Sequence, residues 1–228
     1  MSAVPIVTID GPSGSGKGTI SRAVAAHAGW RLLDSGALYR LVALAGHEAG
    51  LDPSDRGGHA RLAAAMDVHF GASAQGQEAR LSLGGVDVTA RVRSQEVGQG
   101  ASRVALWPEV RNALLQRQRA FAQPPGLVAD GRDMGTIVFP AAELKVFLTA
   151  SLQERTLRRY KQLKGKGSDV SLAALSREIT ERDLRDSSRH VAPLVPAPDA
   201  EVIDSTGLTI DQVVERVMAA GRSRLLWT

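Results

Sequence analysis

Residues 11–19, with the sequence GPSGSGKGT, have the composition of a loop that binds the phosphate groups of a nucleotide. Closely spaced glycines let successive backbone N–H groups curl around phosphate oxygens, and the N-terminus of a following helix attracts negative charge. A lysine at the end of such a loop, here Lys17, reaches the β- and γ-phosphates. Because the segment lies between a β-branched run and a helical pattern, we interpret it as a phosphate-binding loop (P-loop).

One position departs from the general pattern of P-loops. The lysine is normally followed by Ser or Thr, whose hydroxyl ligates Mg²⁺, whereas here Gly18 follows Lys17 and Thr19 comes next. The Thr19 hydroxyl could act on a phosphate or through water. Asp130, at the end of a later apolar run, could steady Mg²⁺ in the same indirect way. No direct metal ligand is predicted.

The rest of the chain favours phosphoryl transfer over hydrolysis. A GTPase needs an Asn-Lys-x-Asp guanine reader, and the single asparagine, Asn112, lies in an Arg/Gln-rich segment. Many ATPases end a strand in Asp-Glu to activate water, but the corresponding strand here ends in Asp130-Gly131-Arg132-Asp133. A phosphate monoester as acceptor does not need such a glutamate, because its second pKa of about 6 leaves the attacking oxygen largely ionised near neutral pH.

Arginines occur where such an acceptor and its donor need charge neutralisation. Arg40 follows the second predicted strand, and Arg111 lies on the predicted helix after Trp107-Pro108. Arg132 lies at the carboxyl end of a core strand, where doubly wound sheets bind ligands. For each of these the alternative is a solvated surface arginine.

A further set of arginines lies in residues 151–189. Helical spacing places those at 155, 158 and 159 on one side of a first helix, and Arg182, Asp186 and Arg189 along one stripe of a second. Two helices around a glycine tip at 164–167 are typical of a moving lid. The alternative is a set of i,i+4 salt bridges on exposed helix faces.

These residues require a scaffold of alternating strands and helices. Short apolar runs predict strands, and Ala/Leu-rich patterns predict helices; Thr209 and Gln212 form a capping box before the last helix. The result is an α/β fold with a largely parallel sheet covered on both faces. The predicted strands are 4–10, 31–33, 127–130, 144–148 and 201–204, and the predicted helices are 17–28, 37–49 and 210–224.

Between the second and third core strands lies an insertion. Residues 66–89 alternate around Gly84-Gly85, which predicts a small antiparallel hairpin unit, and helices are expected over 94–105 and 109–122.

Composition limits the remaining classes of protein. The 228 residues include no cysteine, which excludes disulfide frameworks, cysteine zinc sites and thiol nucleophiles. No apolar run is long enough to span a bilayer, and the first residues lack the layout of a secretion signal, so we expect a cytoplasmic protein. The net charge of +4 is localised, because residues 153–189 hold ten Lys/Arg against six Asp/Glu and the rest of the chain balances. A local excess suits a small polyanion better than nucleic acid.

Five segments together resemble bacterial cytidylate kinases, the P-loop enzymes that phosphorylate CMP and dCMP, and the resemblance covers essentially the whole chain. The segments are IDGPSGSGKGT (9–19), LLDSGALYR (32–40), QEVGQGASRVA (95–105), ADGRDMGTIVFP (129–140) and ERDLRDSSRHVAPLVPAPDA (181–200). The resemblance implies a three-layer P-loop kinase fold with a parallel core sheet (1–36, 125–150 and 190–228), a nucleoside-monophosphate-binding region with a small antiparallel sheet (37–124), and a helical lid (151–189).

The resemblance also implies a role for each site residue. It implies Mg²⁺ as cofactor, with ATP and either CMP or dCMP as substrates. The protein would be a monomer that binds neither nucleic acid nor a membrane. ATP phosphates would contact Gly11, Pro12, Ser13, Gly14, Ser15, Gly16, Lys17, Gly18 and Thr19. CMP would contact Ser35, Arg40, Ser102, Arg111, Arg132, Asp133, Arg182, Asp186 and Arg189. Developing charge would be stabilised by Lys17, Arg132, Arg158, Arg182 and Arg189. The lid arginine would be Arg158 or Arg159.

Two alternatives remain at this point. One is another small P-loop kinase whose acceptor is UMP or a non-nucleotide. The other is a non-enzymatic nucleotide-binding regulator, or a nucleic-acid binder that uses the basic lid segment.

Overall fold

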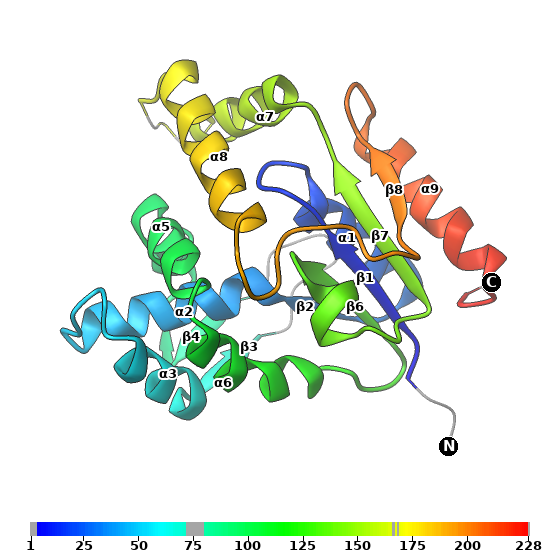
Figure 1. The fold of residues 1–228 in the computed structure, drawn as a ribbon. Coiled ribbons are helices and arrows are strands. Elements are labelled where there is room, and N and C mark those ends of the chain that lie inside the picture. Colours follow the sequence, from blue (N-terminus) through cyan, green and yellow to red (C-terminus); the bar gives the residue numbers. More distant parts are fainter. Residues whose placement is uncertain (1–3, 72–79, 166, 168, 228) are drawn as a thin grey trace. The chain divides into compact units, whose positions relative to one another are not determined.

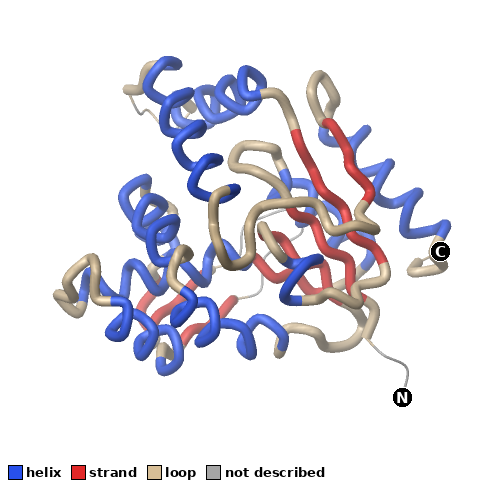
Figure 2. The backbone as a smooth tube through the Cα atoms, viewed as in Figure 1, coloured by secondary structure: helices blue, strands red, loops and turns tan. Residues whose placement is uncertain are grey.

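A computed structural model of the chain describes residues 4–71, 80–165, 167 and 169–227. Helices and strands alternate along most of it (Figures 1 and 2). They are β1 (Ile6–Asp10), α1 (Lys17–Ala28), β2 (Arg31–Asp34), α2 (Ser35–Glu48), α3 (Arg56–Ala65), β3 (Val68–Phe70), β4 (Leu81–Leu83), β5 (Val86–Asp87), α4 (Thr89–Val92), α5 (Gln95–Val104), α6 (Pro108–Arg119), β6 (Leu127–Gly131), the π-helical turn η1 (Met134–Val138), β7 (Leu144–Thr149), α7 (Leu152–Lys164), α8 (Leu172–Ser187), β8 (Glu201–Asp204) and α9 (Ile210–Ser223).

The chain divides into two compact units. Unit 1 comprises Met1–Leu32 and Ala122–Thr228, and unit 2 comprises Leu33–Phe121. The division falls inside β2, and the nucleoside-monophosphate-binding region expected at 37–124 stays a prediction. The separation of the lid from the core, predicted at residues 151–189, stays a prediction.

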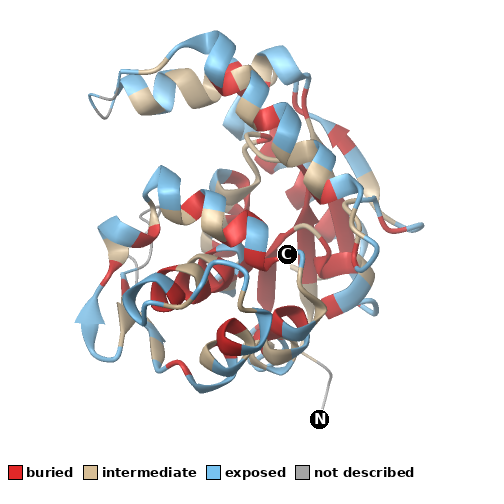
Figure 3. Ribbon diagram, turned by 60° about the vertical axis from the view of Figure 1, so that its left-hand side comes forward, coloured by how far each residue is buried: buried red, intermediate tan, exposed pale blue. Residues whose placement is uncertain are grey.

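Unit 1 is built on a five-stranded sheet with the strand order β2-β6-β1-β7-β8. β1 pairs in parallel with β6 on one side and β7 on the other, and β7 pairs in parallel with β8. The central strands β1, β6 and β7 are buried along most of their length (Figure 3). A buried parallel sheet needs apolar residues on both faces, which explains the short Val/Ile/Leu-rich runs of the sequence.

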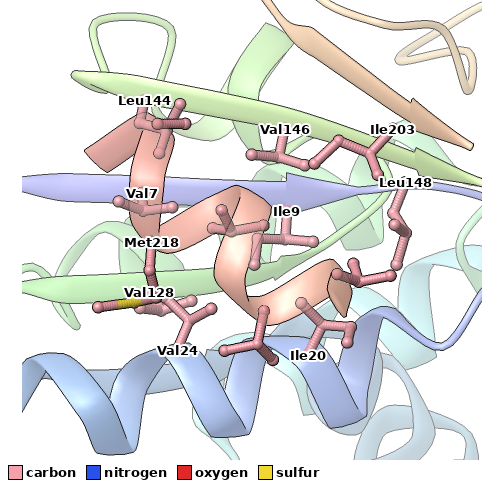
Figure 4. Close-up of a cluster of buried hydrophobic side chains, with 14 of the residues drawn as sticks. Val7, Ile9, Ile20, Val24, Val128, Leu144, Val146, Leu148, Ile203 and Met218 are labelled. Carbon is pink, nitrogen blue, oxygen red and sulfur yellow. The ribbon is translucent and has the colours of Figure 1, made fainter. Parts of the chain in front are cut away.

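One face of this sheet is covered by α1 and α9. Alternate β1 residues Val7 and Ile9 point to this face and pack with Val24 of α1 and Met218 of α9 (Figure 4). α9 begins at the expected capping box, since the Thr209 hydroxyl accepts a hydrogen bond from the backbone N–H of Gln212. The capping box and the helix after it are therefore confirmed.

The other face of β1 meets η1, an element that the sequence analysis did not anticipate. Thr8 and Asp10 point to this face, and a Cβ added to Gly135 of η1 would lie 2.8 Å from the Thr8 hydroxyl. Glycine at 135 therefore allows the turn to lie directly on the strand. Both faces of the central strand are covered, as predicted.

Unit 2 contains α2 to α6 and a three-stranded antiparallel sheet with the order β3-β4-β5. The expected turn at Gly84-Gly85 joins β4 to β5, and both glycines have positive φ. The helix predicted at 37–49 is present as α2 and begins earlier than expected, at Ser35. The Asp34 carboxylate accepts a hydrogen bond from the N–H of Ala37 and so caps the helix at this point.

Two helices of unit 2 were not predicted, α3 and the short α4. The first turn of α3 includes Gly57 and Gly58, which disfavour helix in isolation, but its N-terminus is capped by the Asp55 carboxylate. The predicted helices at 94–105 and 109–122 are present as α5 and α6.

The predicted pair of helices in 151–189 is also present, as α7 and α8, which pack against each other. The expected glycine tip at 164–167 includes residue 166, which lies outside the described residues. Within the part of the chain that the structure describes, no helix is long and apolar enough to cross a membrane.

Candidate active site

The P-loop joins β1 to α1 in a conformation that depends on its glycines. A Cβ at Gly11 would lie 2.0 Å from the backbone oxygen of Leu148, so no other residue fits beside β7. Gly16 has a φ of 92° and stands at the N-cap of α1, where no side chain caps the helix. An uncapped helix N-terminus can take an anion as its cap, so this geometry fits a phosphate.

Lys17 is the first residue of α1 and its ammonium group lies against the loop. Its Nζ donates a hydrogen bond to the backbone oxygen of Pro12 at 3.1 Å. Burial lowers the pKa of Lys17 below its usual range, the positive charge of Arg132 lowers it further, and the carboxylate of Asp130 opposes both. A phosphate at this position would favour the charged ammonium.

The departure at Gly18 has a physical reason. A Cβ at this position would lie 3.2 Å from the Asp130 Oδ2 atom, at the end of β6. The carboxylate thus occupies space next to the position where other P-loops carry their hydroxyl residue. Thr19 is exposed, and its hydroxyl accepts a hydrogen bond from Arg22 at 3.4 Å.

Asp10, at the end of β1, holds the loop that follows β6. Its two carboxylate oxygens accept hydrogen bonds from the N–H groups of Met134 and Gly135, at 2.9 and 2.8 Å. Burial raises the pKa of Asp10 to about 7, although both hydrogen bonds oppose the rise. Asp10 was not among the predicted site residues, although its place directly before the P-loop marks it in the sequence.

Asp186 of α8 connects the lid segment to the end of β6. Its carboxylate, 1% exposed, accepts a hydrogen bond from the Arg132 Nε at 2.9 Å and pairs with Arg189. Burial raises the pKa of Asp186, but Arg132, Arg189 and Arg182 outweigh it and the pKa lies below its usual range. Burial likewise disfavours the charged form of Arg132, but Asp186 outweighs it and the pKa of Arg132 is raised.

Unit 1 therefore brings together most of the residues predicted on its segments. The charges of Arg132, Arg182 and Asp186 all act on the pKa of Lys17, and Asp186 is ion-paired with Arg132. Asp130 and Asp133 are also buried, at 8% and 3% exposure.

Arg158 differs in its surroundings from these residues. Its guanidinium donates to the backbone oxygens of Ser15 and Ser205, at 3.1 and 2.7 Å, and to Glu154 one turn earlier in α7. It lies beside the P-loop backbone, and its predicted contact with transferred charge stays a prediction.

The predicted acceptor-binding residues of unit 2 lie on α2, α5 and α6. Arg40 of α2 donates to the backbone oxygens of Val92 and Ser94 at 3.0 and 3.2 Å, and its guanidinium lies against Gly98 of α5, where a Cβ would be 2.9 Å from it. The close approach to Gly98 holds the Arg40 guanidinium against the surface of α5.

Arg111 and Ser102 are both buried. Arg111 donates to the Ala105 backbone oxygen and its guanidinium lies 5.7 Å from the centre of the Tyr39 ring. The Ser102 hydroxyl has no hydrogen-bond partner among the described residues, which leaves a polar atom for a ligand to meet. Ser35, the first residue of α2, is 4% exposed.

Known proteins are similar to this chain over nearly its whole length. The family model described as cytidylate kinase matches residues 7–223. A protein named cytidylate kinase from Pseudomonas savastanoi pv. phaseolicola is 59% identical over 94% of this chain and 94% of its own length. Proteins of the same name from Stutzerimonas stutzeri and Azotobacter vinelandii are 56% and 58% identical over 95% and 96% of this chain. The chain therefore belongs to the cytidylate kinase family.

Proposed function

We propose that the protein transfers the γ-phosphoryl group of ATP to CMP or dCMP, giving ADP and CDP or dCDP, by direct in-line attack. The observation that carries the proposal is the buried cluster in which Asp186 pairs with both Arg132 and Arg189, together with the Lys17 ammonium held on the P-loop. Such a cluster suits two phosphorylated substrates, because their repulsion must be neutralised before the reacting atoms can approach.

In this proposal the P-loop, residues 11–19, binds the ATP phosphates. Lys17, the last but two of the loop residues, is also the first residue of α1. Its ammonium group would stay in contact with the γ-phosphoryl group during transfer and stabilise the charge that develops on its oxygens. No carboxylate is needed as a base, since the acceptor phosphate is already ionised near neutral pH.

Arg132, Arg182 and Arg189 would bind the acceptor phosphate and the transferred group. In the free protein Asp186 balances Arg132 and Arg189. A phosphate dianion competes with that carboxylate for the same guanidinium groups, so its arrival would free Asp186 for a neutral hydrogen-bond donor such as a sugar hydroxyl. Asp133 would contact CMP from the same unit.

Unit 2 would bind the rest of CMP. Ser35 and Ser102 suit the polar edge of cytosine, and the buried Ser102 hydroxyl supports this assignment because it lacks a partner among the described residues. Arg40 and Arg111 would contact the phosphate or the base. Their guanidinium groups are held by backbone oxygens, which fixes their orientation in advance.

Mg²⁺ would accompany ATP, and the residues present fit it. Among the described residues no cluster of three acidic or histidine side chains could hold a metal alone. Mg²⁺ keeps several waters and relies on substrate phosphates plus one or two carboxylates, so a buried Asp130 beside Gly18 is sufficient. Asp130 and Thr19 would hold the ion through water, and the ion would neutralise charge on the β- and γ-phosphates.

Steady-state kinetics with CMP, dCMP, UMP and AMP, following ADP release, test the proposal. CMP and dCMP should give the highest kcat/KM values. A faster reaction with UMP or AMP would reject the cytidine assignment, and ATP binding without turnover of any acceptor would reject the kinase.

Arg132→Ala tests the site, with Arg177→Ala on α8 as the control, because Arg177 is exposed to solvent. We expect kcat/KM for CMP to fall by about 100-fold or more in the first variant, as for loss of a charge-stabilising group, and to stay unchanged in the second. An unaffected Arg132→Ala enzyme would remove Arg132 from the site.

A further inference from the structure

The peptide groups of the P-loop have a defined outer side. Each peptide is planar and trans, so its C=O points away from its N–H. If the N–H groups of Gly14 and Gly16 turn inward to phosphate, the carbonyls of Ser13 and Ser15 turn outward. Whatever binds those two carbonyl oxygens therefore determines how the N–H groups are presented.

Two arginines of α7 bind these carbonyls. The Arg155 Nη1 atom donates to the Ser13 oxygen at 3.0 Å, and the Arg158 Nη1 atom donates to the Ser15 oxygen at 3.1 Å. The Ser205 hydroxyl donates to the Ser15 oxygen as well, at 3.3 Å. Both outward carbonyls are held from one side of one helix.

The contact at Ser13 is the more closely packed. Arg155 is 7% exposed, and its Nε donates to the Ala150 oxygen at 3.0 Å, which fixes the side chain at the start of α7. A Cβ at Gly14, whose φ is 78°, would lie 3.1 Å from the Cβ of Arg155. The turn of the P-loop at residues 13 and 14 thus lies directly on this residue.

The same Nη1 atom of Arg155 also donates to Asp183 of α8, at 2.6 Å. An Nη1 group has two hydrogens, so one nitrogen joins the Ser13 carbonyl to α8. Asp183 is next to Arg182 and three residues before Asp186, the residues placed above at the acceptor site. A shift of either the P-loop or α8 must change the other's bond to Arg155.

We propose that Arg155 is a positioning residue that fixes the Gly14 peptide of the P-loop and couples ATP binding to acceptor binding through Asp183. The inference rests on the proposed function for the identity of the acceptor. Its first half, the orientation of the P-loop, concerns ATP alone.

Equilibrium binding of a non-hydrolysable ATP analogue and of CMP, each alone and with the other saturating, tests both halves by calorimetry. Wild type should bind CMP at least about 5-fold more tightly in the presence of the analogue, the lower range for coupled sites. In R155M the Kd of the analogue alone should rise about tenfold or more, as for a lost charge-assisted hydrogen bond, and the coupling should disappear.

Asp183→Asn separates the two roles. It keeps Arg155 on the Ser13 carbonyl but weakens its link to α8, so the analogue alone should bind within about twofold of wild type while the coupling falls. R155K should restore part of the analogue affinity, because one ammonium can reach one of the two acceptors. Arg177→Met, at an exposed arginine of α8, is the matched control and should change neither quantity.

The double variant R155M/D183N replaces R155M if the single variant does not fold. It removes the Asp183 carboxylate that R155M would leave without its Arg155 partner. It should reproduce the weak analogue binding. Wild-type analogue affinity in R155M or in the double variant, or full coupling in D183N, would overturn the inference. Failure of the proposed function is distinguishable, since it would appear as absent CMP turnover in wild type.

Discussion

Asp186→Asn tests whether one buried carboxylate balances two guanidinium groups in the free protein. The Asp186 side chain is 1% exposed, and its partners Arg132 and Arg189 are 17% and 5% exposed. Asparagine keeps the shape of the side chain but removes the charge, and its amide N–H groups would face N–H donors. The two guanidinium groups would then lie buried without the carboxylate that they share.

The expected loss of unfolding free energy is about 3–5 kcal/mol, the usual cost of removing one partner from a buried ion pair. This is a large part of the total stability of a domain, which is about 5–15 kcal/mol. Urea denaturation at pH 7, followed by far-UV circular dichroism in a buffer without phosphate, measures it.

The same variant makes a prediction about pH. Because the pKa of Asp186 is lower in the folded protein than in the unfolded chain, its contribution is complete above the unfolded pKa. It is lost as the pH falls through the folded pKa. The wild-type advantage over Asp186→Asn should therefore shrink below about pH 4.

Asp169→Asn is the control, since Asp169 is fully exposed and pairs with Lys164 on the surface. Its expected effect is below about 1 kcal/mol. If Asp186→Asn loses no more stability than Asp169→Asn, the guanidinium groups are balanced by solvent and the account of the site in the free protein is wrong.

Three further predictions concern other parts of unit 1. Gly18→Ala places a Cβ 3.2 Å from Asp130, so steady-state kinetics should show a KM for ATP raised about 5-fold or more by overpacking; an unchanged KM would contradict the account of this glycine. The pKa of Asp10 is raised to about 7, so the folded state holds the proton more tightly than the unfolded chain and this group lowers stability as the pH rises from about 4 to 7. Asp10→Asn should remove that part of the slope in urea denaturation series, and an unchanged slope would count against it. Trp227→Ala removes an edge contact with Trp30 at 5.2 Å and a hydrogen bond to the Met218 oxygen; it should lower the unfolding free energy by about 2–4 kcal/mol at constant kcat, and a fall in kcat would show that this contact reaches the site.

The parts of the site that depend on adjacent residues were predictable from the sequence. The P-loop requires glycines and a lysine within nine positions between a strand and a helix, and β1, residues 11–19 and α1 follow that pattern. The cap formed by Thr209 and Gln212 is equally local. In both cases the residues that decide the conformation are neighbours in the chain.

The parts that depend on distant partners were not predictable. η1 is held by the Asp10 carboxylate, which binds Met134 and Gly135 from more than 120 positions away. Arg155 meets its P-loop carbonyl across 142 positions. No local pattern marks such pairs, because an arginine on a charged helix has the same sequence whether it faces solvent or a backbone oxygen.

The charge of residues 153–189 illustrates how distant partners decide what each arginine does. An excess of four positive charges in residues 153–189 favours a polyanionic ligand, but a charge count treats all the arginines as equal. In the structure Arg155 and Arg158 bind backbone oxygens of the P-loop and the carboxylates of Asp183 and Glu154. Arg189 is bound to Asp186, a group that a phosphate can replace. Backbone oxygens cannot leave, whereas a carboxylate can be exchanged for a phosphate of greater charge. Within residues 153–189, substrate thus cannot displace the backbone oxygens that hold Arg155 and Arg158, whereas Arg189 can exchange its carboxylate partner for a phosphate.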